Sequence, residues 1–214
     1  MNIAIIGAGN VGGTLGTRWA KLGHKITFGV RAPNDPKIKK VLDAAGPNAK
    51  AASVSDAAAG AEVVVLTTPW EATQNAVQSA GNLAGKIVID ATNPLLSGAE
   101  GLKKGLVTGH TTSAAEQVAA WAKGAHVVKA FNTTGAGNMA DPKYGNQNAS
   151  MFVCGDDPQA RETVKKLSDE LGFDTIDAGP LSIARYLEPA AMLWIHLAYG
   201  CGLGTNFAFK VVKR

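Results

Sequence analysis

The sequence contains few of the residues that form disulfide, metal or membrane sites. Its 214 residues include two cysteines, Cys154 and Cys201, whose separation matches neither a metal-binding nor a redox spacing. We therefore expect two buried, reduced thiols in a cytoplasmic protein and no metal site. No apolar run reaches the ~20 residues that a membrane-spanning helix needs, which argues against a membrane partner.

Charge of either sign is also limited and evenly spread. The chain has 21 Lys and Arg against 17 Asp and Glu, a net charge of +4, and its basic residues form only short pairs such as Lys39-Lys40. A nucleic-acid surface requires a basic cluster, so we expect no nucleic-acid partner. The mild positive balance suits small anionic ligands instead.

What the sequence does contain is a glycine-rich turn near its start. An apolar run leads into Gly7, and Gly9 and Gly12 complete a GxGxxG pattern before a helix expected over 14–22. In dinucleotide-binding folds these glycines allow a tight turn, close approach of a pyrophosphate, and close packing of helix on strand. A second strand, expected over 25–31, makes the pattern specific. We predict that the free amides at the start of the helix face a pyrophosphate.

The end of this second strand indicates which dinucleotide is preferred. A site that prefers NAD carries Asp or Glu there for the ribose 2′-hydroxyl, whereas this chain has Val30 and Arg31, with Lys37 nearby and no carboxylate before Asp35. A guanidinium can bind a phosphate through two hydrogen bonds. We predict NADP(H), with Arg31 and Lys37 near the 2′-phosphate; the alternative is that both are solvated loop cations.

Runs rich in Val and Ile alternate with alanine-rich helical stretches along most of the chain. Several runs are continuously apolar, as in parallel strands that are covered on both faces. This alternation predicts an α/β, Rossmann-type fold with a doubly wound, mainly parallel sheet. Further strands are expected at 49–53, 62–68, 86–91, 126–132, 150–154 and 174–178, and further helices at 37–45, 55–60, 71–80, 112–123 and 158–171.

The pattern changes after residue 181. A helical stretch over 183–197, apolar on most faces, precedes a glycine cluster at 200–204 and a short tail. We predict an NADP-binding Rossmann domain over 1–181 and a helical extension over 182–214 that completes the cleft, both within a single structural unit. The glycine-rich segment 97–110 is expected to be a long loop, either a lid or a surface excursion.

Polar residues follow three of the predicted strands. Thr67, Thr68 and Pro69 end one strand, Asn93 follows the next, and Asn132 follows another. In a doubly wound sheet, ligands bind outside the carboxyl ends of the strands, so these residues are candidates to hold the ribose and the nicotinamide carboxamide. The alternative is that the Thr-Pro and Asn-Pro pairs only shape turns.

The sequence offers no obvious general acid for the reduction of a carbonyl group. It has no Tyr-x-x-x-Lys pair, and no histidine is clearly placed in the cleft. Hydride transfer between a nicotinamide and a flavin-like ring needs no such acid, because the protein supplies stacking, distance and exclusion of water. We therefore predict no catalytic side chain beyond positioning residues, and an acceptor such as FMN, FAD or a deazaflavin.

Short motifs spread nearly end to end along the chain carry a family resemblance. They are GAGNVG at 7–12, GVRAP at 29–33, TTPWE at 67–71, SAAE at 113–116, CGDD at 154–157 and AGPL at 178–181, with Arg185 and Glu188 after it. Together these motifs resemble the NADP oxidoreductases that use the deazaflavin coenzyme F420. The segment AFNT at 130–133 is also similar to the cytosolic reductase domain of six-transmembrane metalloreductases. The resemblance implies a homodimer that binds NADP(H) and stacks a flavin or deazaflavin on the nicotinamide.

Residue by residue, the resemblance implies a fuller site. It implies contacts to the pyrophosphate from Ala8, Gly9, Asn10, Val11 and Gly12. It also implies that Val30 accompanies Arg31 at the 2′-phosphate, and that Asn132 lies beside the nicotinamide. The acceptor cleft would include Trp70, Pro94, Thr133 and Leu203, the last in the turn that closes the pocket.

The chain departs from this family at two places. Val30 and Ala32 stand where the family carries a serine and often a second arginine, so use of NAD(H) stays open. Asn132 stands where the family has a histidine near the deazaflavin ring, so a flavin or another acceptor stays open. We expect Arg185 and Glu188 to form an ion pair one helical turn apart, with a substrate-binding Arg185 as the alternative.

Two other functions are compatible with the sequence. An NADP(H)-binding sensor or regulatory module without turnover explains the lack of catalytic residues equally well. A small imine or keto-acid reductase is disfavoured, because that chemistry usually requires a long helical second domain. Binding of an acceptor ring beside the nicotinamide distinguishes the flavin or deazaflavin reductase from the sensor.

Overall fold

Ten strands are present in the computed structural model, which describes residues 1–96 and 98–214. Eight of them form one large sheet and two form a small hairpin. The strands are β1 (Asn2–Ile6), β2 (Lys25–Gly29), β3 (Ala49–Ala52), β4 (Val63–Leu66), β5 (Ile87–Asp90), β6 (His126–Lys129), β7 (Lys143–Tyr144), β8 (Gln147–Asn148), β9 (Ser150–Gly155) and β10 (Asp174–Asp177).

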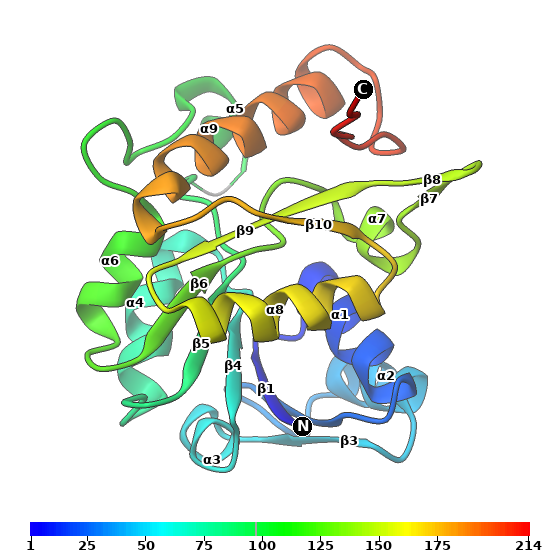
Figure 1. Cartoon of the computed structure of the whole chain (residues 1–214). Helices are drawn as coiled ribbons and strands as arrows, with labels where there is room; N and C mark the ends of the chain where they lie inside the picture. The colour runs from blue at the N-terminus through cyan, green and yellow to red at the C-terminus, as the bar shows by residue number, and fades with distance from the viewer. Residues whose placement is uncertain (97) are drawn as a thin grey trace.

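The large sheet has the order β10-β9-β6-β5-β4-β1-β2-β3 (Figure 1). Neighbouring strands run parallel except β6 and β9, which are antiparallel. The strand order reverses at β1, which pairs with β2 on one side and β4 on the other. Such a reversal opens a crevice at the carboxyl edge of a doubly wound sheet. The predicted Rossmann-type, mainly parallel fold is confirmed.

Helices cover both faces of this sheet. One face packs against α1 (Asn10–Lys21), α2 (Pro36–Ala45), α7 (Ala136–Ala140) and α8 (Pro158–Glu170). The other face packs against α3 (Val54–Ala59), α4 (Trp70–Ser79) and α6 (Ala114–Trp121). Along β1, Ile3 and Ile5 belong to the first core and Ala4 and Ile6 to the second. The continuously apolar strands are therefore buried on both faces, as predicted.

Local signals in the sequence explain several helix starts. Ser113 Oγ accepts a hydrogen bond from the Glu116 backbone N–H at 3.2 Å, so the Ser-x-x-Glu sequence at 113–116 caps the start of α6. Asp157 caps α8 through the Ala160 N–H at 2.7 Å, with Pro158 as the first helical residue.

The structure corrects some boundaries. Helix α1 begins at Asn10 rather than at residue 14, because the Gly13 N–H bonds to the Gly9 carbonyl at 2.7 Å and closes a helical turn through the glycines. The expected loop at 97–110 contains α5 (Ala99–Lys104), whose flanking glycines, Gly98 and Gly105, have positive φ angles and act as caps. Ser97 lies outside the described residues.

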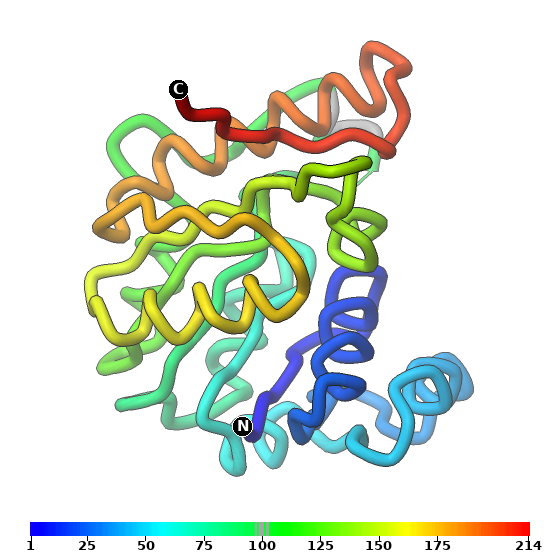
Figure 2. The backbone as a smooth tube through the Cα atoms, turned by 45° about the vertical axis from the view of Figure 1, so that its right-hand side comes forward, coloured from blue at the N-terminus to red at the C-terminus, as the bar shows by residue number. Residues whose placement is uncertain are grey.

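The C-terminal segment forms a layer across the carboxyl edge of the sheet. It consists of η1 (Leu181–Ile183), α9 (Ala184–Ile195) and the π-helical η2 (His196–Gly200), after which the chain runs back along α9 (Figure 2). Trp194 stacks on Phe207 with ring centroids 5.1 Å apart, and the Phe209 carbonyl accepts from the Ser150 N–H at 2.9 Å. The returning tail is thus fixed to both α9 and β9.

Within the described residues, none of the helices is both long and apolar enough to cross a bilayer. The expectation of two buried thiols is wrong for one of them. Cys154 is buried, whereas Cys201 is exposed because it lies in the turn after η2, and both are free.

Candidate active site

The glycine turn joins β1 to α1 with geometry that only glycine permits at two positions. Gly7 has a φ of 103°, a conformation that side chains disfavour. At Gly12 an added Cβ would lie 2.2 Å from the Gly7 carbonyl oxygen and 2.4 Å from Thr67 Oγ1. These glycines therefore allow the tight turn and the close approach of helix and strand.

Gly9 is different, and it shows that the turn fits a pyrophosphate. A Cβ added there would meet no protein atom within 4 Å, and its φ of −75° suits any residue. Protein packing therefore does not require glycine at this position, whereas an anion lying against the backbone does. The first turn of α1 has no acidic residue and its N-cap makes no side-chain hydrogen bond, so the amide dipoles are available to an anion. Asn10 is exposed, whereas Ala8 and Val11 pack against the core.

A cleft of about 470 Å³ opens above this turn, between β1, β2 and β4. Part of its lining was not anticipated: Ala72, Asn75, Ala76 and Ser79 share one face of α4 at spacings of three and four residues, a pattern visible in the sequence. Asp35, Ile38 and Val54 complete the far end. The predicted residues that line the cleft are Gly7, Gly9, Val30, Arg31, Thr67, Thr68 and Pro69.

Arg31 lies at the end of the cleft beyond β2. Its side chain is exposed, and Asp35 nearby caps α2 through the Lys37 N–H at 2.8 Å. Lys37 itself is exposed and lies outside the lining that the described residues form. The structure therefore brings Arg31, but not Lys37, to the cleft wall, and the role of each at a 2′-phosphate stays a prediction.

The two threonines after β4 use their hydroxyl protons within the protein. Thr67 Oγ1 lies 3.0 Å from the carbonyl oxygens of both Ile6 and Gly7, so it joins the ends of β4 and β1. Thr68 Oγ1 lies 2.9 Å from Thr73 Oγ1, which donates to the Pro69 carbonyl at 3.1 Å. Thr68 therefore donates to Thr73, and its oxygen remains able to accept a hydrogen bond from a ligand.

Two amides follow the neighbouring strands β5 and β6, outside the cleft lining. Asn93 Nδ2 donates to the Asn132 carbonyl at 3.0 Å, and Asn132 Nδ2 donates to Asn93 Oδ1 at 3.1 Å and to the Leu187 carbonyl at 3.2 Å. Asn132 is 5% exposed, and its Oδ1 has no hydrogen-bond partner within the described chain. Because an unpaired buried acceptor is costly, this oxygen indicates a ligand that donates a hydrogen bond.

The residues predicted for the acceptor cleft do not form one group. Trp70 stacks on Trp121 with centroids 5.4 Å apart, and this pair packs between α4 and α6. The Pro94 carbonyl accepts from the Val107 N–H at 2.8 Å, and Thr133 is buried. Leu203 is 60% exposed in the turn after η2. Their contact with an acceptor stays a prediction.

A buried ion cluster, missed at the level of sequence, lies beside the two amides. The Lys129 Nζ is 2.9 Å from Asp90 Oδ2, 2.9 Å from Glu188 Oε1 and 2.7 Å from the Thr92 carbonyl. Burial alone lowers the pKa of Lys129, but the two carboxylates outweigh it, so the pKa lies above its usual value and the ammonium stays charged. In the sequence, Asp90, Lys129 and Glu188 each stand within an otherwise apolar stretch, and this pattern could have indicated a buried ion cluster.

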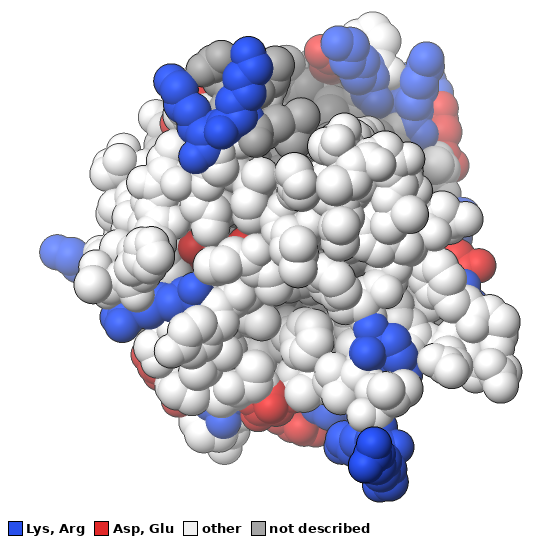
Figure 3. All heavy atoms as spheres, turned by 90° about the horizontal axis from the view of Figure 1, so that it is seen from above, with Lys and Arg blue, Asp and Glu red and all other residues white. Residues whose placement is uncertain are grey.

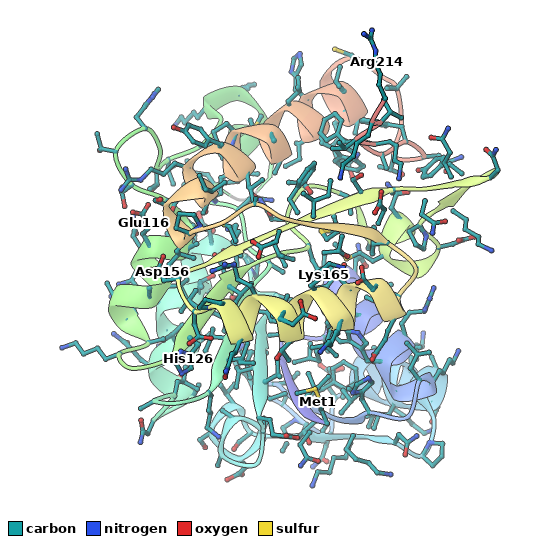
Figure 4. All side chains as sticks on the ribbon, in the orientation of Figure 1. Met1, Glu116, His126, Asp156, Lys165 and Arg214 are labelled. Carbon is teal, nitrogen blue, oxygen red and sulfur yellow. The ribbon has the colours of Figure 1, made fainter. Side chains whose placement is uncertain are left out.

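This cluster overturns the expected ion pair between Arg185 and Glu188. Glu188 turns inward to Lys129 and accepts from the Ala114 and Ala115 N–H groups at the start of α6, at 2.9 and 3.2 Å. Arg185 turns to Glu116 on α6, with Nε–Oε2 and Nη2–Oε1 distances of 2.9 and 2.6 Å. Glu116 is labelled at the junction of α6 and α9 in Figure 4. Glu188 is buried and Arg185 is half-buried, so the two side chains lie in different surroundings and do not meet.

The thiol of Cys154 is unsuited to redox chemistry. Burial raises its pKa to about 12, so the thiol is protonated at neutral pH and is not nucleophilic.

Comparison with known proteins agrees with this geometry. Residues 2–94 match the family model described as NADP oxidoreductase coenzyme F420-dependent. An F420-dependent NADP reductase of Methanothermobacter thermautotrophicus is 32% identical over 207 residues, covering 92% of this chain and 89% of the relative. The chain belongs to the F420-dependent NADP oxidoreductase family.

Two further similarities show how much of each related protein this chain covers. A crystal structure of an Arthrobacter sp. FB24 protein assigned as an F420-dependent NADP-reductase superposes with a TM-score of 0.90 at 37% identity, covering all of both chains. Metalloreductase STEAP3 of Rattus norvegicus is 30% identical over 187 residues, which are 87% of this chain but 35% of that protein. The chain thus spans about a third of the metalloreductase, 89% of the Methanothermobacter thermautotrophicus reductase and all of the Arthrobacter chain.

Proposed function

We propose that this protein transfers hydride between NADPH and a flavin or deazaflavin that stacks on the nicotinamide. The observation that carries the proposal is the cleft in which the glycine turn, the start of α1 and Arg31 face one open space. The curated reductases of 30% and 32% identity, which act with F420, support the same activity. When bound, the nicotinamide supplies the hydride and the flavin-like ring accepts it.

The protein's own residues bind and orient the reactants. The amides at the start of α1 hold the pyrophosphate, and Arg31 holds the 2′-phosphate through charge-assisted hydrogen bonds. Asn132 Oδ1 accepts a hydrogen bond from the carboxamide, which satisfies its unpaired oxygen. The segment 182–214, which we take as an extension of the Rossmann domain, covers the carboxyl edge and excludes water.

Turnover with separate acceptors tests this proposal. NADPH oxidation is followed at 340 nm with FMN, FAD, riboflavin or the deazaflavin coenzyme in different cuvettes. We expect turnover with at least one ring, and that ring is then the acceptor. Tight NADPH binding without turnover on any of them contradicts the reductase and supports the sensor, while turnover of an imine or keto acid supports the third candidate.

We also propose that the protein is a homodimer in the cytoplasm. From Tyr186 to Phe209 the only Lys, Arg, Asp or Glu is Glu188, which is buried. Seen from above, this side of the molecule forms a broad uncharged face with charged groups around its rim (Figure 3). Its exposed side chains include Tyr186, Leu193 and Tyr199, which suits a self-complementary interface. The two free thiols suit a reducing compartment.

Light scattering after gel filtration tests the dimer. Leu193→Lys places a charge on a side chain that is 52% exposed within the uncharged face, and we expect a monomer. Leu22→Lys, at a side chain 49% exposed at the end of α1, is the matched control and should leave the mass unchanged.

A further inference from the structure

The buried ion cluster and the Asn132 amide are joined through two consecutive residues of α9. The Leu187 carbonyl accepts from Asn132 Nδ2 at 3.2 Å, and Glu188 Oε1 lies 2.9 Å from Lys129 Nζ. Lys129 and Asn132 are themselves three residues apart at the end of β6. One turn of α9 therefore contacts the end of β6 at two points, one through its backbone and one through an ion pair.

The cluster is fully hydrogen-bonded, which makes it a rigid junction. Lys129 uses its three N–H groups on Asp90, Glu188 and the Thr92 carbonyl. Asp90 Oδ1 also accepts from the Thr92 N–H at 2.9 Å and from Thr92 Oγ1 at 2.7 Å. Glu188 also accepts from the start of α6. The Lys129 ammonium thus connects β5, β6 and α9, and Glu188 extends this connection to α6. In this interior, loss of one partner leaves an unpaired charge.

The amide of Asn132 has its orientation fixed by this arrangement. Both N–H groups of Nδ2 are used, one on Asn93 and one on the Leu187 carbonyl, so Oδ1 is the group left to accept. A reversed amide would place an oxygen against the Leu187 carbonyl, which repels it. The orientation therefore depends on where α9 holds that carbonyl.

We propose that the Lys129–Glu188 ion pair is a positioning element that holds α9 against β6 and thereby keeps the Asn132 oxygen free for the nicotinamide carboxamide. This inference rests on the proposed function, since it assumes that the dinucleotide extends to Asn132. Both residues are positioning residues, because neither contacts the ligand and each acts through the amide. Loss of the pair should weaken the nicotinamide end of the site and leave the phosphate end intact.

Calorimetric titration with two ligands separates these ends. NADP+ carries the nicotinamide, whereas adenosine 2′,5′-bisphosphate carries the adenosine and the 2′-phosphate without it. In Glu188→Gln the negative charge is removed, and one of the two oxygens that accept from Lys129, Ala114 and Ala115 becomes an NH2 group, so the ion pair is lost. We expect NADP+ affinity to fall about five- to tenfold and the bisphosphate affinity to change less than about twofold.

Glu116→Gln is the matched control. It makes the same substitution in a second ion pair of α9, in which Arg185 meets Glu116 of α6 at 2.6 Å, without touching Lys129 or Asn132. We expect both ligands to bind it as they bind the wild type. Equal weakening of NADP+ by the two variants would mean that α9 needs general anchoring only, and the positioning role would be wrong.

A double-mutant cycle then tests whether the effect passes through the amide. In an Asn132→Ala background, Glu188→Gln should not weaken NADP+ further. An undiminished effect in that background contradicts the proposal. If Glu188→Gln does not fold, Thr92→Val keeps the shape and removes one hydrogen bond from Asp90, and we expect about a threefold loss for NADP+ alone.

The wild-type titrations distinguish failure of the inference from failure of the proposed function. Wild-type protein that does not bind NADP+ contradicts the proposed function itself. Wild-type protein that binds NADP+, together with a Glu188→Gln variant that loses both ligands equally or neither, contradicts only the positioning role.

Discussion

The two ends of the carboxyl edge are built in different ways. At the end formed by β1, β2 and β4, the site depends on backbone shape, since Gly7 and Gly12 allow the tight turn and Gly7 and Gly9 line an open cleft. At the end formed by β5, β6 and α9, it depends on side chains that hold one another, with Lys129 at 0% exposure among its partners.

The two ends differ in whether the residues that form them are close together or far apart in the sequence. The glycine turn of the first end is encoded within one short segment, so we expect substitutions in it to act directly on the ligand or the backbone. The second end exists only when Asp90, Lys129 and Glu188, distant in sequence, come together. Substitutions at the second end therefore act through tertiary packing.

The largest effect is expected from substitutions in the glycine turn at the first end. Gly12→Ala forces a Cβ to within 2.2 Å of the Gly7 carbonyl oxygen, and we expect the free energy of unfolding to fall by about 3 kcal/mol, measured by urea denaturation. Gly9→Ala is the matched control, because its Cβ meets no protein atom within 4 Å. It should keep wild-type stability and lose at least about tenfold in affinity for both NADP+ and NAD+, because the methyl occupies the pyrophosphate position. A loss of stability in Gly9→Ala would contradict the view that Gly12 is needed for protein packing and Gly9 for the ligand.

A smaller effect at the same end is expected on the preference for NADPH over NADH. Arg31→Ala should weaken NADPH by roughly 1.5–3 kcal/mol and leave NADH nearly unchanged, because it removes a charge-assisted hydrogen bond to the 2′-phosphate. Lys37→Ala, which removes a cation outside the cleft lining, is the control and should change both affinities little. Fluorescence titration measures both. Equal losses for NADPH and NADH in Arg31→Ala would show that this arginine does not bind the phosphate.

The contrast also explains how much could be predicted. The Rossmann-type sheet, the glycine turn and the helix caps at Ser113 and Asp157 depend on residues close together in sequence, and the fold was predicted correctly. The pairing of Arg185 and Glu188 was predicted wrongly, because spacing along one helix does not reveal what each face meets. The ion cluster was missed because its three members lie on different elements.

The smallest effect concerns pH at the second end. Hydrogen bonding from the Arg185 guanidinium lowers the pKa of Glu116 below 4.5 in the folded protein. The pair therefore stabilises α9 at pH values above the unfolded pKa, and this contribution is lost as the pH falls through the lower, folded value. Because both side chains are partly exposed, solvent screens the pair and we expect its contribution to stability to be small. The difference in melting temperature between wild type and Glu116→Gln should shrink from pH 7 to pH 3; a constant difference would contradict this.

The reversed direction of β9 has a consequence for the order of assembly during synthesis. Because β9 runs antiparallel to β6, its first residue, Ser150, lies at the ligand edge, where the Phe209 carbonyl accepts its N–H. All residues that line the cleft lie before residue 80, so the nascent chain contains them long before α9 and Phe209 leave the ribosome. The two ends of this edge are therefore synthesised at different times, and the end that contains the glycine turn comes first.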